Sequence, residues 1–334
     1  MNSSTTSSDA SRILVRRYFV GFFSVAALLS AITFWLAYPI APQFTGNVSF
    51  DQKLMFVRDH LETSGEKITL VVGSSMALNN VDTDILTERL VSPYFDLGVW
   101  GMSIADAHRL ADQIADRYPT RDIILSTQFF ELRDEALTNF TVTNEVLDQY
   151  LNGTRLFGGF AQRDFYESLK LRRDWVRTYA NPNSYVNMQF NRSGAVPLDI
   201  SADERDPVRW LPVQDFPAVC ASCMDDVEKM CQDLGRRGIG FSVVLPPLTQ
   251  WVRDQRPEVN ALYLDRKERL RASLRACNAP LFDADEWAAF DDSCFADFSH
   301  LNREGTRQMS DMVVLWRQGE GIPTRGHVTC KHQK

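Results

Sequence analysis

Residues 67–75 read KITLVVGSS, and this stretch decides the fold. A short apolar run that stops at a glycine is typical of a buried strand in a parallel sheet. Residues 81–90 then have the pattern of a helix, 94–100 that of a second strand, 103–118 that of an amphipathic helix and 122–130 that of a third strand. Strands that alternate with helices in this way predict an α/β domain with a mostly parallel sheet.

The alternation pauses between residues 132 and 213, where aromatic and charged residues mix with Asn, Gly and Pro and no clean period remains. We interpret this stretch as an inserted, partly helical subdomain. A helix over 219–238, a strand over 239–247, a helix over 260–277 and a short strand over 280–285 resume the pattern. The expected fold is therefore a flavodoxin-like three-layer α/β/α sandwich around a mostly parallel five-stranded sheet.

Residues 19–40 contain no charged side chain, and about 20 apolar residues suffice to cross a bilayer as a helix. We therefore expect a transmembrane anchor over 19–41. The apolar region of a secretory signal peptide is shorter, about 7–15 residues. Cleavage of the segment as a leader, after Ala37 or Ala41, is the alternative.

Three basic residues precede the span: Arg12, Arg16 and Arg17. The positive-inside rule then makes residues 1–18 a cytoplasmic tail of an inner-membrane protein and places the rest on the periplasmic or extracellular side. Residues 42–66 are expected to form a juxtamembrane linker with a helix, 67–325 the extracytoplasmic domain and 326–334 a tail.

Composition narrows the partners and the compartment. The formal net charge is −7 and no long run of Lys and Arg appears, so nucleic-acid binding is not expected. The six cysteines suit an oxidising compartment, although six thiols allow 15 pairings and the sequence does not choose among them. Cys220 and Cys223 lack a second pair or suitably spaced histidines, so we expect disulfides or inert thiols, with no metal site and no cofactor.

Polar residues and glycines follow the predicted strands, at the sheet edge where active groups gather in open parallel sheets. Ser75 follows the first strand, Gly101 the second and Gln128 the third. Near the C-terminus, CFADFSHLNREG carries Asp297 three residues before His300. A serine, a histidine and an aspartate at loop positions satisfy the nucleophile, base and orienter logic of acyl transfer.

These motifs, GSS, a glycine, a polar amide and a closing D-x-x-H, resemble those of the SGNH (GDSL-like) hydrolase family over residues 67–315, with the insertion excepted. The resemblance implies that Ser75 is the nucleophile, His300 the base and Asp297 the residue that orients it. It also implies an oxyanion hole formed by the Ser75 and Gly101 backbone N–H groups and the Gln128 side-chain amide. The alternative for Gln128 is a polar residue that caps the end of the third strand.

Two positions depart from the family pattern, because Ser74 replaces the usual Asp and Gln128 the usual Asn. With those residues, the chain looks like the membrane-anchored D-alanyl transfer proteins of teichoic-acid modification, as does VVLPPLTQW at 243–251. That likeness implies an envelope polymer as substrate and a membrane-bound O-acyltransferase as partner.

Together, the resemblances imply a membrane-anchored, extracytoplasmic serine esterase or O-acyltransferase. It would act on acyl groups, chiefly acetyl, of a cell-surface polysaccharide through an acyl-serine intermediate. Two alternatives stay open: a non-catalytic subunit that binds the polymer or recruits the acyltransferase, and a lysophospholipase or thioesterase. Four residues are candidates for the substrate cleft: Ser74, Trp100, Phe129 and Trp251. The alternative for Ser74 is a helix N-cap after the first strand, and core packing is the alternative for most of the aromatic residues.

Overall fold

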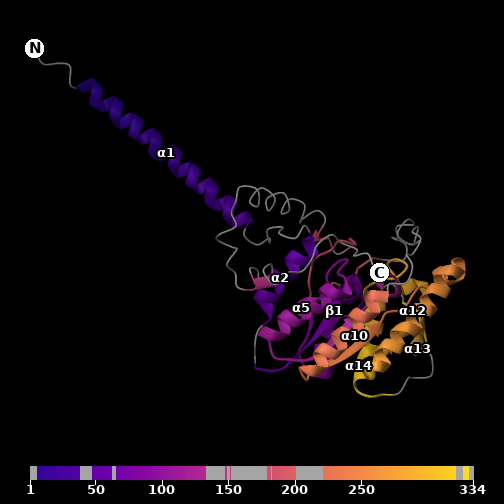
Figure 1. Ribbon diagram of the computed structural model, residues 1–334. Coiled ribbons are helices and arrows are strands. Elements are labelled where there is room, and N and C mark those ends of the chain that lie inside the picture. Colours follow the sequence, from indigo (N-terminus) through magenta and orange to yellow (C-terminus); the bar gives the residue numbers. More distant parts are fainter. Residues whose placement is uncertain are drawn as a thin grey trace, which may run out of the picture.

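The predicted strands form the centre of the structure, a computed structural model (Figure 1). It describes residues 6–37, 47–61, 65–132, 147–148, 151, 179–181, 183–200, 221–320 and 326–330. Most of the insertion at 132–213 lies outside the described residues, so its predicted helical content stays a prediction.

Five parallel strands form the main sheet, in the order β2-β1-β3-β4-β5. Their bounds are β1 Ile68–Gly73, β2 Tyr94–Asp96, β3 Thr120–Ser126, β4 Gly240–Leu245 and β5 Leu281–Asp283. The expected α/β fold and five-stranded parallel sheet are confirmed. Because chain order and spatial order reverse beside β1, the carboxyl end of this strand is a topological switch point, where sites form in such sheets.

The strands alternate their side chains between two buried layers, so both faces need a helical cover. On one face, Leu70, Ile123 and Val243 pack in the same core as residues of α2, α5, α10 and α12. On the other face, Val71, Ile124 and Val244 pack with residues of α4 and α14. The three-layer sandwich is thus a direct result of strands that carry apolar side chains on both faces.

The helices of the domain that cover the sheet or its edges have the following bounds: α2 Val48–His60, α3 Ser75–Asn80, α4 Thr83–Leu90, α5 Ile104–Arg117, α10 Ala221–Arg236, α11 Gln250–Gln255, α12 Pro257–Ala276, α13 Ala284–Trp287 and α14 Arg303–Arg317. Helix α3 was not predicted, because six residues directly after a strand are too few to show a helical period.

Helix α2 belongs to the core of the domain and is not a linker. The segment 42–66 was expected to lead out of a membrane, yet Phe50, Leu54 and Val57 on α2 are fully buried against the sheet. The N-cap of α2 is Asn47, whose side chain accepts from the Phe50 N–H. The domain therefore begins about twenty residues before the first strand.

A buried ion pair holds α2 to the end of β2. Lys53 Nζ lies 2.7 Å from Asp96 Oδ1 and 2.6 Å from the carbonyl oxygen of Gly194, and both charged side chains have no exposed surface. Asp96 Oδ1 also accepts from the Gly98 N–H at 2.8 Å. Burial lowers the pKa of Lys53 and raises that of Asp96, while each partner opposes the shift of the other.

Part of the predicted C-terminal tail, 326–334, belongs to the domain. Strand β7, Gly326–Val328, pairs with β6, Ala288–Phe290, and a disulfide joins Cys330 to Cys294. A second disulfide joins Cys231 to Cys277, and Cys223 is also disulfide-bonded. The expectation of structural disulfides is confirmed for these cysteines.

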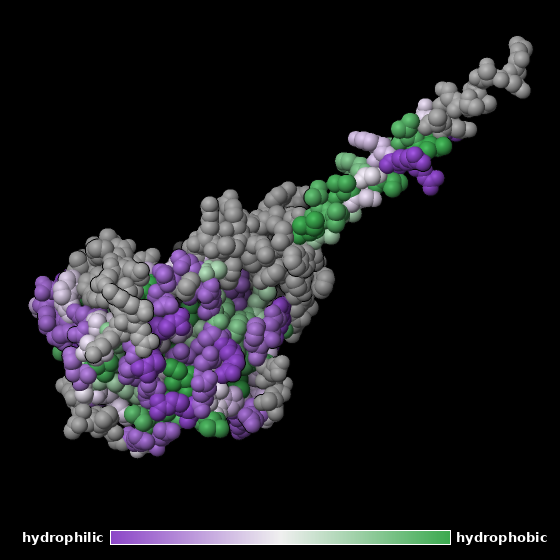
Figure 2. Space-filling model, turned by 180° about the vertical axis from the view of Figure 1, so that it is seen from behind, coloured by the Kyte–Doolittle hydropathy of each residue, from purple (hydrophilic) through white to green (hydrophobic). Residues whose placement is uncertain are grey.

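Helix α1, Thr6–Ala37, lies outside the α/β domain (Figure 1). Its stretch Ser11–Ile32 is long and apolar enough to cross a membrane, by length and composition, and none of it is buried in the chain. A secretory signal sequence meets the same test. Figure 2 shows hydrophobic residues along this helix, whereas the visible face of the domain is largely hydrophilic. The helix extends further toward the N-terminus than the predicted span of 19–41, and residues 38–41 lie outside the described part.

Candidate active site

The chain turns sharply where β1 ends, and Ser75 begins the helix that follows. Gly73 has a φ of +143°, and a Cβ at this position would lie 2.2 Å from the carbonyl oxygen of Ser126 on β3. Only glycine fits such a close approach. Ser74 caps α3 by accepting the Met76 N–H, and Ser75 is the first helical residue, half-buried at the sheet edge.

His300 and Asp297 come from the loop before α14, and they meet Ser75 across 225 residues of sequence. His300 Nε2 lies 2.8 Å from Ser75 Oγ, and His300 Nδ1 lies 2.7 Å from Asp297 Oδ2. The other carboxylate oxygen, Oδ1, accepts from the Ser299 N–H at 2.9 Å and the His300 N–H at 2.7 Å. The predicted nucleophile, base and orienter thus form one hydrogen-bonded chain.

The charge of Asp297 decides which imidazole nitrogen carries the proton. Burial by itself raises the pKa of the Asp297 carboxyl, but the His300 charge and the hydrogen bonds from His300 and Ser299 outweigh burial and lower this pKa. An ionised carboxylate only accepts hydrogen bonds, so Nδ1 carries the proton. Nε2 is then left to accept the proton of the Ser75 hydroxyl, as a general base does.

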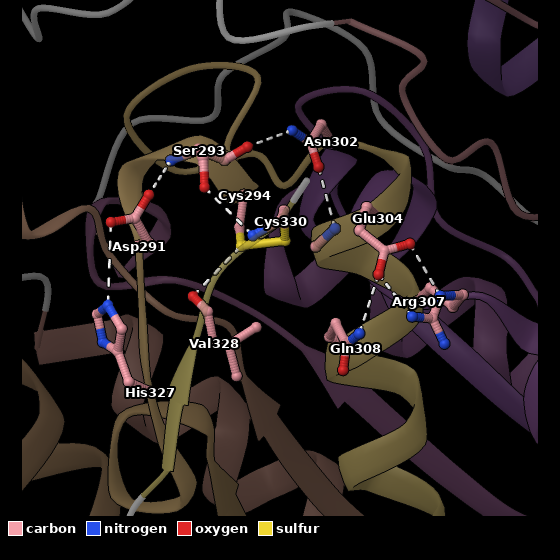
Figure 3. Close-up of a disulfide and its surroundings, with 11 residues drawn as sticks. Asp291, Ser293, Cys294, Asn302, Glu304, Arg307, Gln308, His327, Val328 and Cys330 are labelled. Atoms are coloured by element: carbon pink, nitrogen blue, oxygen red, sulfur yellow. Dashed lines mark hydrogen bonds and ion pairs between the residues drawn. A yellow bond between two sulfur atoms is a disulfide. The ribbon is translucent and has the colours of Figure 1, made fainter. Parts of the chain in front are cut away.

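The disulfide between Cys294 and Cys330 fixes the start of the loop that carries His300 (Figure 3). Asn302 holds the other end of this loop: its Nδ2 donates to the Ser293 carbonyl at 2.7 Å, and its Oδ1 caps α14 by accepting from the Gly305 N–H at 3.0 Å. The Asn302 N–H also donates to the Cys294 carbonyl at 2.9 Å. The start of the loop is therefore linked covalently to the C-terminal segment, and hydrogen bonds from Asn302 join its two ends.

Two backbone N–H groups are candidates for an oxyanion hole. As the first residue of α3, Ser75 has an N–H without an acceptor inside the helix. Gly101 lies in the loop after β2 with a φ of +65°. Gly98 brings this loop against α3, because a Cβ at Gly98 would lie only 2.4 Å from the backbone nitrogen of Leu78. The predicted roles of Ser75 and Gly101 in the hole stay proposals.

The structure gives Gln128 a different role from the one expected. Its side chain is fully buried, its Nε2 donates to the Pro246 carbonyl at 2.7 Å, and its Oε1 accepts from the Phe129 N–H at 2.9 Å. The extra methylene relative to Asn carries the amide into the β4 loop. Gln128 thus caps the short helix η1, Phe129–Glu131, and ties β3 to β4, so the prediction of a side-chain oxyanion donor is wrong in this arrangement.

We expect Gln128→Ala to lower thermal stability while kcat stays within about threefold of the wild type, because the lost bonds hold the β3 and β4 loops together. Removing a partner of buried hydrogen bonds costs roughly 1–3 kcal/mol in stability. Steady-state kinetics and a melting curve on the same preparation check this. A kcat lowered by about 10²-fold or more with unchanged melting temperature would restore Gln128 to the oxyanion hole.

Two of the four predicted cleft residues do not line a cleft. Ser74 and Phe129 are each only 1% exposed, because Ser74 caps α3 and the Phe129 ring packs in the core against Tyr263. Trp100 and Trp251 are half-buried. Their contact with substrate stays a prediction.

No pattern in the sequence indicated that residues 183–200 of the insertion lie beside the elements of the site. Val196 donates its N–H to the Leu78 carbonyl of α3 at 2.7 Å, and Leu198 accepts from the Arg303 N–H at the start of α14 at 2.6 Å. Tyr185 donates its hydroxyl to the Ala296 carbonyl in the His300 loop. This segment therefore contacts the elements that carry both Ser75 and His300.

No group of three or more His, Cys, Asp or Glu side chains among the described residues is arranged to hold a metal ion.

One site therefore contains the serine after β1 and the D-x-x-H loop, at the carboxyl edge of the parallel sheet. The strand order and the geometry of Ser75, His300 and Asp297 agree with the resemblance to the SGNH hydrolases that the sequence motifs indicated. Searches with the sequence found no matching family model and no matching curated protein.

Several solved structures are similar to this chain. An acetylxylan esterase from Geobacillus stearothermophilus is 12% identical, with a TM-score of 0.37 over 79% of this chain and 99% of that one. A carbohydrate acetylesterase family member from Sinorhizobium meliloti is 14% identical, with a TM-score of 0.33 over 76% of this chain and 99% of that one. An aryl esterase from M. smegmatis is 11% identical, with a TM-score of 0.35 over 76% and 99%. The roles of individual residues therefore rest on the geometry described above, and the likeness to D-alanyl transfer proteins stays a prediction.

Proposed function

We propose that this chain is a serine esterase or O-acyltransferase that acts on acyl groups, chiefly acetyl, of a cell-surface polysaccharide. The single observation that supports it best is the continuous hydrogen-bonded chain from Ser75 through His300 to Asp297. A polar chain of this kind, with a half-buried nucleophile at the carboxyl edge of the sheet, has the geometry that acyl transfer requires. The acetyl group and the polysaccharide rest on the resemblance described above.

In the first half of the proposed reaction, Ser75 Oγ attacks the ester carbonyl carbon while His300 Nε2 takes the serine proton. The Ser75 and Gly101 N–H groups stabilise the oxyanion that forms, where one such donor is worth about 3–4 kcal/mol of barrier. The tetrahedral intermediate collapses, His300 returns the proton to the departing alkoxide, and the acyl group stays on Ser75.

In the second half, an acceptor hydroxyl attacks the acyl-Ser75 carbonyl and gives its proton to His300. The second tetrahedral intermediate collapses, the bond between the acyl carbon and Ser75 Oγ breaks, and His300 returns the proton to Ser75 Oγ. Water as acceptor completes hydrolysis, whereas a sugar hydroxyl completes transfer. The two outcomes use the same residues in the same order. They differ only in which acceptor reaches the acyl-enzyme.

The probe that tests this function is a fluorophosphonate, which bonds covalently to an activated serine. We expect the full-length protein to be labelled at Ser75, and prior reaction with the probe to remove aryl acetate hydrolysis. Adding an acetylated oligosaccharide donor and an unmodified acceptor then separates transfer from hydrolysis by mass. An unlabelled, folded protein would instead favour the non-catalytic subunit.

We also propose that α1 is retained as an inner-membrane anchor, that the domain lies on the periplasmic or extracellular side, and that a membrane-bound O-acyltransferase is its partner. The disulfides of the described domain support an oxidising compartment.

The topology is tested with reporters at the C-terminus. Because the three arginines precede the span, we expect an alkaline phosphatase fusion to be active and a green fluorescent protein fusion to be dark. The opposite pattern would overturn the topology. Release of the phosphatase fusion into the soluble fraction would show that α1 is a cleaved leader.

A further inference from the structure

We infer that Asn80 is a positioning residue that fixes His300 relative to Ser75, an inference that rests on the proposed function of this site. Asn80 is the last residue of α3 and its side chain is fully buried. The hydrogen-bond partners of its side chain are Met76, Ser299 and Leu301, none of which is a reacting group.

The Asn80 side chain holds the backbone on both sides of His300. Its Nδ2 donates to the Ser299 carbonyl at 3.1 Å, and its Oδ1 accepts from the Leu301 N–H at 2.8 Å. These two groups belong to the residues directly before and after the catalytic base. One buried amide therefore fixes both the position and the direction of the backbone segment that carries the imidazole.

The helix that carries this amide also carries the nucleophile. Ser75 is the first residue of α3 and Asn80 the last, so both belong to one rigid helical unit. The distance between Ser75 Oγ and His300 Nε2 is then set by a short local path through α3. This matters because a displacement of about 1 Å in a catalytic group can cost roughly 10²-fold in rate.

Other restraints on the backbone of the His300 loop lie within it or come from elements other than α3: Tyr185 donates to the Ala296 carbonyl, and Thr249 donates its N–H to the Phe298 carbonyl at 3.3 Å. The Ala296 N–H donates to the His300 carbonyl at 2.8 Å, which shapes the loop without linking it to α3. Thr306 donates its hydroxyl to the Asn79 carbonyl at 2.8 Å, which links α3 to α14 one turn beyond the loop. Asn80 is the described side chain of α3 that binds the backbone beside His300 directly. A side-chain amide supplies the required donor and acceptor on two separate atoms of one uncharged group.

The preceding residue offers a matched control. Asn79 is 2% exposed, lies on the same helix, and its Nδ2 donates to the Val196 carbonyl at 2.7 Å. Replacing either asparagine with alanine removes a buried amide from α3. Only the change at Asn80 releases the loop that holds His300.

The experiment compares Asn80→Ala with Asn79→Ala in the full-length protein. Four quantities are measured: kcat and KM on an aryl acetate, the second-order rate of labelling by a fluorophosphonate, the melting temperature, and the low-field proton resonance of His300 Nδ1–H. We expect Asn80→Ala to lower kcat and the labelling rate by about 10–100-fold with KM within about twofold, and to broaden or shift the resonance. Asn79→Ala should lower the melting temperature by a similar amount with kcat within about threefold.

The inference is overturned if Asn80→Ala keeps kcat within twofold of the wild type, or if both variants lose activity in proportion to their lost stability. Should Asn80→Ala fail to fold, Asn80→Asp keeps the shape and the acceptor for Leu301 but loses the donor to Ser299, and is held to the same criteria. If the wild type itself shows neither turnover nor labelling, the proposed function fails. In that case an unchanged His300 resonance in the Asn80 variant would still overturn the positioning role.

Discussion

Replacing Ser75 with alanine is expected to lower kcat on a small aryl acetate by about 10⁴-fold or more, while the melting temperature changes little. The reason is that the Ser75 hydroxyl is bound to His300 and contributes nothing to the core. The residual rate would come from the oxyanion donors and substrate binding, which the substitution leaves in place. Initial rates and melting curves on the same preparations measure both effects.

Ser74→Ala is the matched control for this prediction. Ser74 is buried and caps α3, so its loss should cost about 1 kcal/mol of stability and leave kcat within a few-fold of the wild type. The two adjacent serines are therefore expected to give opposite patterns. Loss of activity in Ser74→Ala alone would mean that Ser74 is the nucleophile. Normal turnover by Ser75→Ala would exclude the triad as the catalytic group.

Lys53→Met is expected to destabilise the domain by about 3–5 kcal/mol, the cost of leaving one partner of a buried ion pair uncompensated. Asp96 would remain fully buried with the Gly98 N–H as a donor, and its Oδ2 has no hydrogen-bond partner among the described residues. Denaturant unfolding of the wild type and the variant measures the difference, provided that the slope with denaturant is unchanged.

The pH dependence of Lys53→Met identifies the cause of its instability. Burial already raises the pKa of Asp96 and Lys53 opposes that shift, so removing Lys53 raises this pKa further. A carboxyl with a raised pKa in the folded state takes up a proton more readily when folded than when unfolded, so its penalty shrinks as the pH falls. The difference in free energy of unfolding between the wild type and Lys53→Met should therefore become smaller as the pH is lowered from neutral to about 5. The double variant Lys53→Met/Asp96→Asn should recover much of the loss at neutral pH, and a deficit that is the same in both variants at every pH would exclude the ion pair as its source.

The strands and the triad were accessible to sequence analysis because their signals are local. A largely apolar run marks each of the larger strands, and Asp297 and His300 are only three residues apart, within one loop. The serine after a strand that ends in glycine completes the pattern, although its 2.8 Å contact with His300 exists only in the folded chain. For these elements, type and order could be predicted, with boundaries that differ by a few residues.

The roles of Gln128, Lys53 and Asn80 could not be predicted because their partners are distant in sequence. Gln128 binds a carbonyl 118 residues away, Lys53 a carboxylate 43 residues away, and Asn80 two backbone groups more than 200 residues away. In the sequence, each appears as an ordinary polar residue in a helix or a loop. Which buried group it satisfies depends on loop positions that the periodicity of apolar residues does not encode.

The α/β domain begins at Asn47, so the segment that would attach it to a membrane is not needed to fold it. Asn47 donates to the Trp100 carbonyl at 2.9 Å, Ser49 accepts from the Trp100 N–H at 2.9 Å, and the next turns of α2 bury Phe50 and Leu54. A secreted fragment that starts at Lys67 would lose these contacts and expose the hydrophobic surface beneath them. A cut anywhere between Ala37 and Asn47 would instead leave the whole described core intact. Under the proposed anchoring by α1, such a cut would release the domain from the membrane without unfolding it.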